Sequence, residues 1–423
     1  MNRIPIPAGM ETECFILDSN ALQDVPKVLS EIFPGRRPWI VADGNTWKAA
    51  GERVQNLLLE GGLNPHEPYL FPAEPLLHPE NCYIETLVNA RPAGAVPVAV
   101  GGGTINDLVK RSSEVAGTRY LCIPTAPSVD GYTSFGAAML VDGLKKTLPC
   151  AAPLALVADT DVLRSAPPAM AAAGYADLFA KIPAGADWII ADAFGFHPIR
   201  EDVWALVQKP LRNWLSDPAD LHALLAGLAA TGYAMQLCRD SRPASGAEHL
   251  ISHVWEMEGV DASHGFKVAV GTLASTALMQ EYFRLSPAEL EAMAVPPRTR
   301  PEREQEIDDL LRPGVYGTEA REIALSKFRE PAECFSFRRE ATAKHAALGR
   351  RVEEQLIPFG EVREMFRRAG CPVHYREIGV ELEQFLHAIR TAQLIRTRYT
   401  VLDLLYETGV FEALLPKIIP YFN

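Results

Sequence analysis

The chain has 423 residues, a formal net charge of −12 and 48% hydrophobic residues, a composition typical of folded globular proteins rather than disordered ones. The negative charge argues against a general nucleic-acid-binding protein, because such proteins need clustered cationic surface. No apolar run approaches the ~20 residues that span a bilayer, and the first ten residues lack the apolar core of a signal peptide. We therefore expect a cytoplasmic protein without a membrane span.

Alternating strand and helix patterns fill the first 160 residues. Short apolar runs predict strands, and segments with apolar residues at helical spacing predict the helices between them. The predicted strands are RPWIVAD, PYLFP, AVPVAV and TRYLCIP, and the clearest predicted helices are TWKAAGERVQNLLLE and CYIETLVNARPA. This alternation predicts an α/β domain over residues 1–160, with a mostly parallel sheet and helices on both of its faces.

From residue 161 onward the pattern becomes helical, and strand patterns are almost absent. Segments such as ADLHALLAGLAATGYAMQLCR and GFKVAVGTLASTALMQEYFRL carry apolar residues at helical spacing. We therefore predict an all-helical second domain over residues 161–423. Within it, the proline- and charge-rich stretch at 295–314 predicts an exposed connection. The apolar helices of this domain also leave a homo-oligomer open.

Three consecutive glycines, Gly101–Gly103, follow the predicted strand AVPVAV. Glycines at the start of a helix let the backbone approach a bulky anion, and the free N–H groups of the first turn supply hydrogen-bond donors. We predict Thr104 as the N-cap, with Asp107 three residues later completing a variant of the capping box. The turn is a candidate phosphate cradle, although a purely structural tight turn has the same pattern.

Two further turns lie where predicted strands end, which is the edge at which ligands bind parallel sheets. The segment PTAPSVDGYTS offers the hydroxyl groups of Thr125, Ser128 and Ser134, and a turn at Asp130 that can direct a carboxylate inward. A capped loop before a hairpin has the same composition. Asp43 ends the first predicted strand, where an acidic side chain can accept hydrogen bonds from ribose hydroxyls. Asp–Gly is also a common turn pair, so a structural role for Asp43 stays open.

Candidate metal ligands occur in three segments of the helical domain. Asp177 lies among apolar residues of a predicted helix, His249 and His253 stand at i and i+4 on one helical face, and His264 opens another apolar helix. A single histidine on such a face is usually a core residue, but this combination is more informative. Two imidazoles and one carboxylate suit Zn²⁺ or Fe²⁺ and leave a coordination position open. An HExxH motif is missing, so the sequence does not support a zincin protease.

Together these motifs resemble the sn-glycerol-1-phosphate dehydrogenases, within the superfamily of iron-containing alcohol dehydrogenases, glycerol dehydrogenase and dehydroquinate synthase. The resemblance runs in order through GGGTIND, PTAPSVDGYTS, AAGYADLFAK, SGAEHLISHVWEM and HGFKVAVGT, with a weaker echo in IRTRYTVLDLL. It implies a dehydroquinate synthase-like fold, in which a nucleotide-binding α/β domain and a helical metal-binding domain flank a cleft. The GFK after His264 and the charged region at 295–356 depart from the family pattern.

The resemblance also implies a role for each motif. Asp177, His249 and His264 would bind the metal, usually Zn²⁺, with Fe²⁺ or Ni²⁺ as alternatives. Asp130, Asp177 and His253 would contact substrate, and Asp130 and His253 would be the catalytic residues, His253 by relaying a proton. The residues that would bind NAD or NADP are Gly102, Gly103, Thr104, Asp107, Thr125, Ser128 and Ser134, joined by Asp43 from its place at a strand end.

The implied reaction interconverts dihydroxyacetone phosphate and sn-glycerol 1-phosphate with NADH or NADPH. Such a phosphorylated polyol needs cationic partners, and the candidates are Lys145, Lys146, Lys181, Arg396 and Arg398. Three alternatives stay open: a dehydrogenase of another small polyol or polyol phosphate such as glycerol, a dehydroquinate synthase-like lyase, and a non-catalytic nucleotide-binding relative. Asp177 disfavours the lyase, for which a glutamate is expected at that position.

Overall fold

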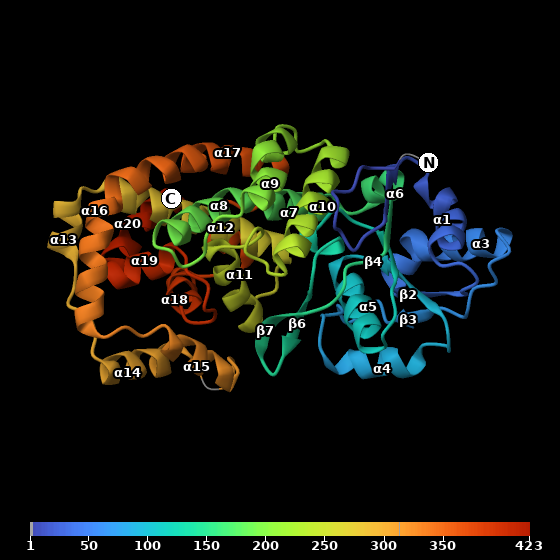
Figure 1. Ribbon diagram of the computed structural model, residues 1–423, viewed down its shortest axis with the longest axis horizontal. Helices are drawn as coiled ribbons and strands as arrows, with labels where there is room; N and C mark the ends of the chain where they lie inside the picture. The colour runs from blue at the N-terminus through green and yellow to red at the C-terminus, as the bar shows by residue number, and fades with distance from the viewer. Residues whose placement is uncertain (1–2, 313) are drawn as a thin grey trace. The chain divides into compact units, whose positions relative to one another are not determined.

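The computed structural model describes residues 3–312 and 314–423 (Figure 1). The chain divides into two compact units. Unit 1 contains the residues up to 141, 145–178 and 209–241, and unit 2 contains 142–144, 179–208 and the residues from 242 onward. The helices α7 (Pro168–Phe179) and α9 (Glu201–Trp214) each run from one unit into the other along the chain.

A six-stranded parallel sheet forms the centre of unit 1. Its strand order is β1-β8-β5-β4-β2-β3, and every pair within it is parallel. The strands are β1 (Cys14–Asp18), β2 (Pro38–Asp43), β3 (Tyr69–Phe71), β4 (Val96–Gly101), β5 (Leu121–Pro124) and β8 (Ala155–Asp159). The four strands predicted from the sequence are β2, β3, β4 and β5. Their carboxyl ends meet at one edge, where the turns after Asp43, Gly101 and Pro124 lie.

Helices α1 to α5 alternate with strands β1 to β5 along the chain, and α6 and α10 follow β8 (Figure 1). Buried side chains of α1 and α3, such as Val28 and Leu58, pack in one apolar core with strand residues such as Ile40 and Val98. The helices are α1 (Val25–Ile32), α2 (Gly44–Thr46), α3 (Glu52–Glu60), α4 (Cys82–Ala90), α5 (Gly103–Val115), α6 (Thr160–Ser165) and α10 (Leu221–Cys238). A π-helical turn joins α2 to α3 over Trp47–Gly51. A two-stranded sheet of β6 (Ala137–Val141) and β7 (Leu144–Leu148) follows β5.

Helix α10 is long and apolar enough to cross a membrane by length and composition alone, but 67% of it is buried inside the protein. It packs against the loop that follows β5, because the Thr133 hydroxyl donates a 2.9 Å hydrogen bond to the Ala229 carbonyl. A Cβ on Gly232 would lie 2.0 Å from that hydroxyl oxygen. We therefore describe α10 as a buried core helix of unit 1.

Unit 2 is helical. The long helix α12 (His264–Arg284) is buried along most of its length and packs against α11, α16, α17 and α20. The other helices, drawn from green to red in Figure 1, are α8 (Lys181–Ala193), α11 (Ala247–Met257), α13 (Pro287–Met293), α14 (Arg300–Leu310), α15 (Thr318–Ser326), α16 (Pro331–Gln355), α17 (Phe359–Ala369), α18 (Leu382–Ala392), α19 (Val401–Thr408) and α20 (Phe411–Ile418). The predicted class, an α/β N-terminal part followed by a helical C-terminal part, is confirmed.

The prediction of an exposed connection at 295–314 is wrong for its central part, which forms α14. A capping box starts the helix, in which the Glu302 carboxylate accepts from the Thr299 N–H at 2.7 Å. Ile307 is fully buried and Arg303 is 3% exposed, and the Arg303 guanidinium lies over the Tyr406 ring at 4.0 Å. The helix therefore buries an arginine and an isoleucine, whereas the composition of the stretch suggests full exposure.

Candidate functional site

The glycine turn joins β4 to α5. Gly102 is the N-cap, and the helix begins at Gly103. The prediction that Thr104 caps this helix is therefore wrong, because the glycine backbone enters the helix two residues earlier and leaves Thr104 inside the first turn. A Cβ on Gly101 would lie 2.6 Å from the Ile105 side chain, and one on Gly103 would lie 2.8 Å from the Val129 side chain. A Cβ on Gly102 would meet no described atom within 4 Å, so packing does not explain that glycine.

A buried lysine on α5 holds the loop that follows β5. The Lys110 ammonium is fully buried and donates to the carbonyls of Gly131, Ser134 and Gly136 at 2.8–3.0 Å and to the Ser134 hydroxyl at 2.9 Å. Asp107 lies 3.8 Å from the same ammonium, and its carboxylate accepts from the Ala138 N–H at 3.3 Å. Burial raises the pKa of Asp107, and the Lys110 charge opposes this shift. The sequence analysis missed Lys110, whose signal was its i, i+3 spacing from Asp107.

The predicted hydroxyl groups of the loop are buried. The Thr125 N–H donates to the Gly101 carbonyl at 3.1 Å, which ties the loop to the glycine turn. The Ser128 hydroxyl lies 3.4 Å from the Tyr132 hydroxyl. The Asp130 N–H donates to the Asp177 carboxylate at 2.9 Å. These hydrogen bonds link the glycine turn, the loop and the carboxylate of Asp177.

Helix α7 lies directly against this loop because of another glycine. A Cβ on Gly174 would lie 1.7 Å from the Pro127 carbonyl oxygen, which steric repulsion forbids, so only glycine fits at this position. Asp177 follows three residues later on the same helix, fully buried. The local packing of Gly174 thus places the Asp177 carboxylate beside Asp130.

Asp43 caps the short helix α2. Its carboxylate accepts from the N–H groups of Asn45 and Thr46 at 2.8 Å, and the Thr46 hydroxyl accepts from the Asp43 N–H at 3.0 Å. The structural role left open for this residue is therefore present. Binding to ribose remains a prediction that nothing in the structure tests.

Three histidines lie together where α11 meets α12. The ring centroids of His249 and His264 are 5.5 Å apart, and that of His253 lies 6.2 Å from the first and 6.3 Å from the second. The side chain of Ser263 caps α12 by accepting from the Phe266 N–H at 3.3 Å, which fixes His264 in the first turn. A Cβ on Gly271 would lie 2.3 Å from the Glu248 carbonyl, so this glycine lets the two helices approach closely.

A carboxylate occupies the Nδ1 side of two of these rings. His249 Nδ1 lies 2.8 Å from Glu248 Oε1, and His264 Nδ1 lies 2.6 Å from Glu256 Oε1. Such contacts fix the tautomer and leave Nε2 as the ligand atom, as carboxylates do behind metal-binding histidines. The sequence analysis did not identify Glu248 and Glu256, although the first is adjacent to His249 and the second follows His253 by three residues.

These side chains fit a divalent cation. One ligand atom from each of Asp177, His249 and His264 lies within 4.8 Å of the other two. Two imidazoles and a carboxylate are ligands that Zn²⁺ and Fe²⁺ accept, and three protein ligands leave a position for substrate. The carboxylates beside both Nδ1 atoms are also typical of metal-binding histidines. The three predicted ligands are therefore close enough together to hold one ion.

His253 differs from its two neighbours. Its Nδ1 is buried and makes no hydrogen bond to any residue that the structure describes. Loss of hydration lowers the pKa of His253 well below its ordinary value, and the Arg396 charge adds to this effect while Glu256 opposes it. The ring is therefore neutral at pH 7 and can accept a proton.

The predicted phosphate-binding cations have different surroundings. Lys181 is fully buried, whereas Lys145, Lys146 and both arginines are partly exposed. Arg398 donates to the Ser245 carbonyl at 2.7 Å and to its hydroxyl. Arg396 is close enough to His253 for its charge to affect the pKa of that ring. Among the candidate cations, Arg396 is the one whose charge the described interactions link to His253.

Comparisons with known proteins show which family and fold this chain resembles. The model of the family described as iron-containing alcohol dehydrogenase matches residues 16–167. By structure, the chain resembles glycerol dehydrogenase from Schizosaccharomyces pombe, with a TM-score of 0.62 and 15% sequence identity over 99% of this chain and 91% of that one. At this identity the likeness shows the fold.

Curated relatives carry the likeness further along the chain. A glycerol-1-phosphate dehydrogenase [NAD(P)+] of Bacillus velezensis is 28% identical over 96% of this chain and 93% of its own length. One of Bacillus subtilis, with the same name, is 31% identical over 87% of this chain and 84% of its own length. These matches confirm the predicted family: the chain belongs to the glycerol-1-phosphate dehydrogenases.

Proposed function

We propose that this protein is a metal-dependent, NAD(P)-linked oxidoreductase that interconverts dihydroxyacetone phosphate and sn-glycerol 1-phosphate. The observation that carries the proposal is the grouping of Asp177, His249 and His264 around one point, in a chain whose curated relatives bear the name of this activity. The cation is Zn²⁺ in our proposal, with Fe²⁺ and Ni²⁺ as alternatives. When bound, it supplies the Lewis acidity that polarises a substrate carbonyl.

The nucleotide would bind at the glycine turn. Gly102 and Gly103 offer backbone N–H groups at the start of α5, where an anion is favoured by the unsatisfied donors and the helix dipole. The absence of a packing reason for Gly102 supports this use. Thr104, Asp107 and the buried hydroxyls of the following loop complete the proposed nucleotide site. The nicotinamide supplies or accepts the hydride.

The side chains of this protein would orient the substrate and move one proton. His253 is neutral at pH 7 and has a buried nitrogen without a hydrogen bond among the described residues, so it can accept the proton of the substrate hydroxyl during oxidation and return it during reduction. Asp130, held by its N–H to Asp177, would accept a hydrogen bond from a second substrate hydroxyl. Arg396 would pair with the substrate phosphate. The overall reduction consumes one hydride and one proton.

A substrate comparison on metal-reconstituted protein tests this proposal. We expect reduction of dihydroxyacetone phosphate to exceed that of dihydroxyacetone, loss of activity on chelation, and the sn-1 enantiomer as product by chiral analysis. Preference for glycerol would favour the other polyol dehydrogenases, and release of phosphate from a seven-carbon sugar acid would favour the lyase. Equal activity after thorough chelation would contradict the metal dependence. Running each arm with NADH and NADPH identifies the preferred nucleotide.

The proposal extends to the setting of the reaction. We propose that the enzyme works in the cytoplasm on a small phosphorylated polyol, without a nucleic-acid partner. A homo-oligomer is part of this proposal, and sedimentation of the purified protein tests it.

A further inference from the structure

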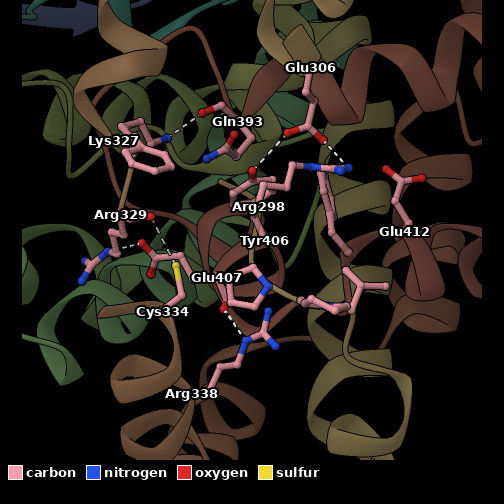
Figure 2. A pocket seen from close by; sticks show the side chains of 16 residues that line it. Arg298, Glu306, Lys327, Arg329, Cys334, Arg338, Gln393, Tyr406, Glu407 and Glu412 are labelled. Carbon is pink, nitrogen blue, oxygen red and sulfur yellow. Dashed lines mark hydrogen bonds and ion pairs between the residues drawn. The ribbon is translucent and has the colours of Figure 1, made fainter. Parts of the chain in front are cut away.

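A cavity lies wholly within unit 2, and none of its lining residues belongs to the proposed metal site. It is enclosed by α14, α16, α19, α20 and the segments before α14 and α16 (Figure 2). Its volume is about 60 Å³. One buried water needs roughly 10–15 Å³ on this measure, so the cavity has room for a group of about four to six heavy atoms. Val295, Phe328 and Phe411 supply apolar walls.

The cavity is lined by four cations and three carboxylates, and most of these charges neutralise one another. Arg298 pairs with Glu306 at 2.9 Å, and Arg329 pairs with Glu407 at 2.5 Å. Lys327 donates to Asp403, a carboxylate outside the lining, and to the Gln393 carbonyl at 2.6 Å. The remaining lining carboxylate, Glu412, is held by Arg390 through two hydrogen bonds of 2.7 and 2.8 Å.

Arg338 is the exception among these cations. Its Nε donates to the Glu407 carbonyl at 3.1 Å, but neither terminal nitrogen has a hydrogen-bond partner, and no carboxylate pairs with it, among the described residues. Figure 2 shows its guanidinium group directed toward the other lining side chains. Arg338 is half-buried, and its guanidinium lies over the Phe335 ring at 5.6 Å. The partial loss of hydration lowers the pKa of Arg338, as expected where no anion offsets it.

The approach of this guanidinium depends on Gly409. A Cβ at that position would lie 2.3 Å from an Arg338 terminal nitrogen and 2.7 Å from the Val295 carbonyl oxygen. Gly409 also ends α19 with a positive φ of 81°. The glycine therefore lets an arginine from α16 reach the end of α19, where it lines the cavity.

We propose that this cavity is a binding site for a phosphate-sized oxyanion, held by the terminal nitrogens of Arg338. A guanidinium presents parallel N–H donors that match two oxygens of a phosphate group. Each of the other three cations already has a carboxylate partner, so the unpaired Arg338 is the cation that an added anion would pair with. The ligand is inorganic phosphate or the phosphate group of a very small ester. The proposal goes beyond the proposed catalytic function and does not depend on it.

Hydrogen–deuterium exchange of the full-length, metal-loaded protein tests this site locally. The probes are inorganic phosphate and methyl phosphate, each against sodium chloride at equal ionic strength. With phosphate at about ten times its dissociation constant, amide hydrogen exchange in the occupied region is expected to slow by roughly tenfold, because exchange requires the ligand-free open form. We expect this protection in the peptides spanning 327–338 and 406–412. If only inorganic phosphate gives protection, the ligand of the cavity is the free ion. If both probes protect equally, the cavity also accepts a phosphate group carried by an ester.

Variants separate this cavity from the catalytic site, which also binds phosphate in our proposal. Arg338→Met removes the charge and keeps an apolar stem, and we expect it to weaken phosphate binding at these peptides by about 10- to 100-fold. Arg338→Lys restores part of the affinity, and Arg339→Met, at the exposed neighbouring position, leaves it unchanged. The proposal is overturned if phosphate protects only the peptides around 128–136 and 249–264. It is also overturned if the Arg338→Met protein, shown to be folded by its thermal denaturation curve, keeps the wild-type protection.

Discussion

The rings of the two proposed ligand histidines are oriented by their Nδ1 contacts. Each ring meets the carboxylate of a neighbouring residue, Glu248 for His249 and Glu256 for His264. A carboxylate at this position orients the ring and makes its other nitrogen a better ligand. We therefore regard Glu248 and Glu256 as positioning residues of the proposed metal site.

Glu256→Gln is expected to weaken metal binding by about 10- to 100-fold, because an amide keeps a hydrogen bond but loses the negative charge behind His264. Competition with a coloured chelator measures this affinity without using activity. Glu258→Gln is the matched control, since Glu258 pairs with His387 and Tyr316 and contacts neither ligand histidine. An unchanged affinity in Glu256→Gln would remove the positioning role.

Arg396→Met is expected to raise the KM for dihydroxyacetone phosphate by about tenfold or more and to leave that for dihydroxyacetone nearly unchanged, because one charged contact to phosphate is lost. Steady-state kinetics with the two substrates provide the measurement. Arg398→Met is the comparison, because this arginine already donates to Ser245. Equal increases for both substrates in Arg396→Met would exclude a phosphate contact.

At the scale of elements, packing explains two of the three glycines in the glycine turn but not the third. Gly101 and Gly103 are dictated by Ile105 and Val129, whereas Gly102 has open space where a Cβ would be. Its backbone, with φ of −77°, suits any residue. Selection of glycine at this position is therefore expected to reflect a ligand rather than the fold.

Gly102→Ala tests this interpretation. We expect its thermal stability to stay near that of the wild type, since the added methyl group meets no described atom, while the dissociation constant for NAD(H) rises by about tenfold or more because the methyl group takes the place of a phosphate oxygen. Fluorescence titration with NADH gives the constant. Gly360→Ala, another glycine with open space at its Cβ, serves as the control. Unaltered NADH binding by a folded Gly102→Ala protein would place the phosphates elsewhere.

The elements show which parts of the molecule were predictable. Apolar runs located β2 to β5, because a buried parallel strand requires such residues throughout. The N-cap at Gly102 was missed, because capping statistics favour Thr104 while the backbone had freedom to turn earlier. Lys110 was missed because a lysine on a helix is usually solvated. Its burial depends on three carbonyl acceptors from the loop after β5, and the sequence does not show that these lie beside it. Helix α14 was missed because the partner that buries Arg303, the Tyr406 ring, lies about 100 residues away.

For the whole molecule, a buried carboxyl group in unit 2 links stability to pH. Burial raises the pKa of Glu407 to about 7, with Asp403 acting in the same direction and Arg329 and the Tyr399 hydroxyl opposing it. The unfolded chain releases this proton near its ordinary value of about 4.3. Between these two values the folded state binds the additional proton, so this group makes stability fall as pH rises, and its contribution is constant above about pH 7.

Glu407→Gln is expected to flatten the dependence of stability on pH between 5 and 7, since the amide does not titrate. The wild-type protein should lose up to about 3 kcal/mol of unfolding free energy through this group across the window. Urea denaturation at several pH values measures the change. Glu412→Gln, an exposed carboxylate paired with Arg390, should keep the wild-type slope. A variant slope equal to that of the wild type would contradict the assignment to Glu407.

The position of β1 in the sheet has a consequence for biosynthesis. Its parallel partner is β8, with Cys14 in register with Ala155, so the first strand leaves the ribosome about 140 residues before the strand that pairs with it. At a translation speed of about 5–20 residues per second, the wait lasts roughly 7–28 seconds. During that interval the apolar segment CFIL lacks β8, the strand beside which it lies at the edge of the sheet, and the nascent chain depends on chaperones or on early collapse of the central strands to keep this segment from aggregating.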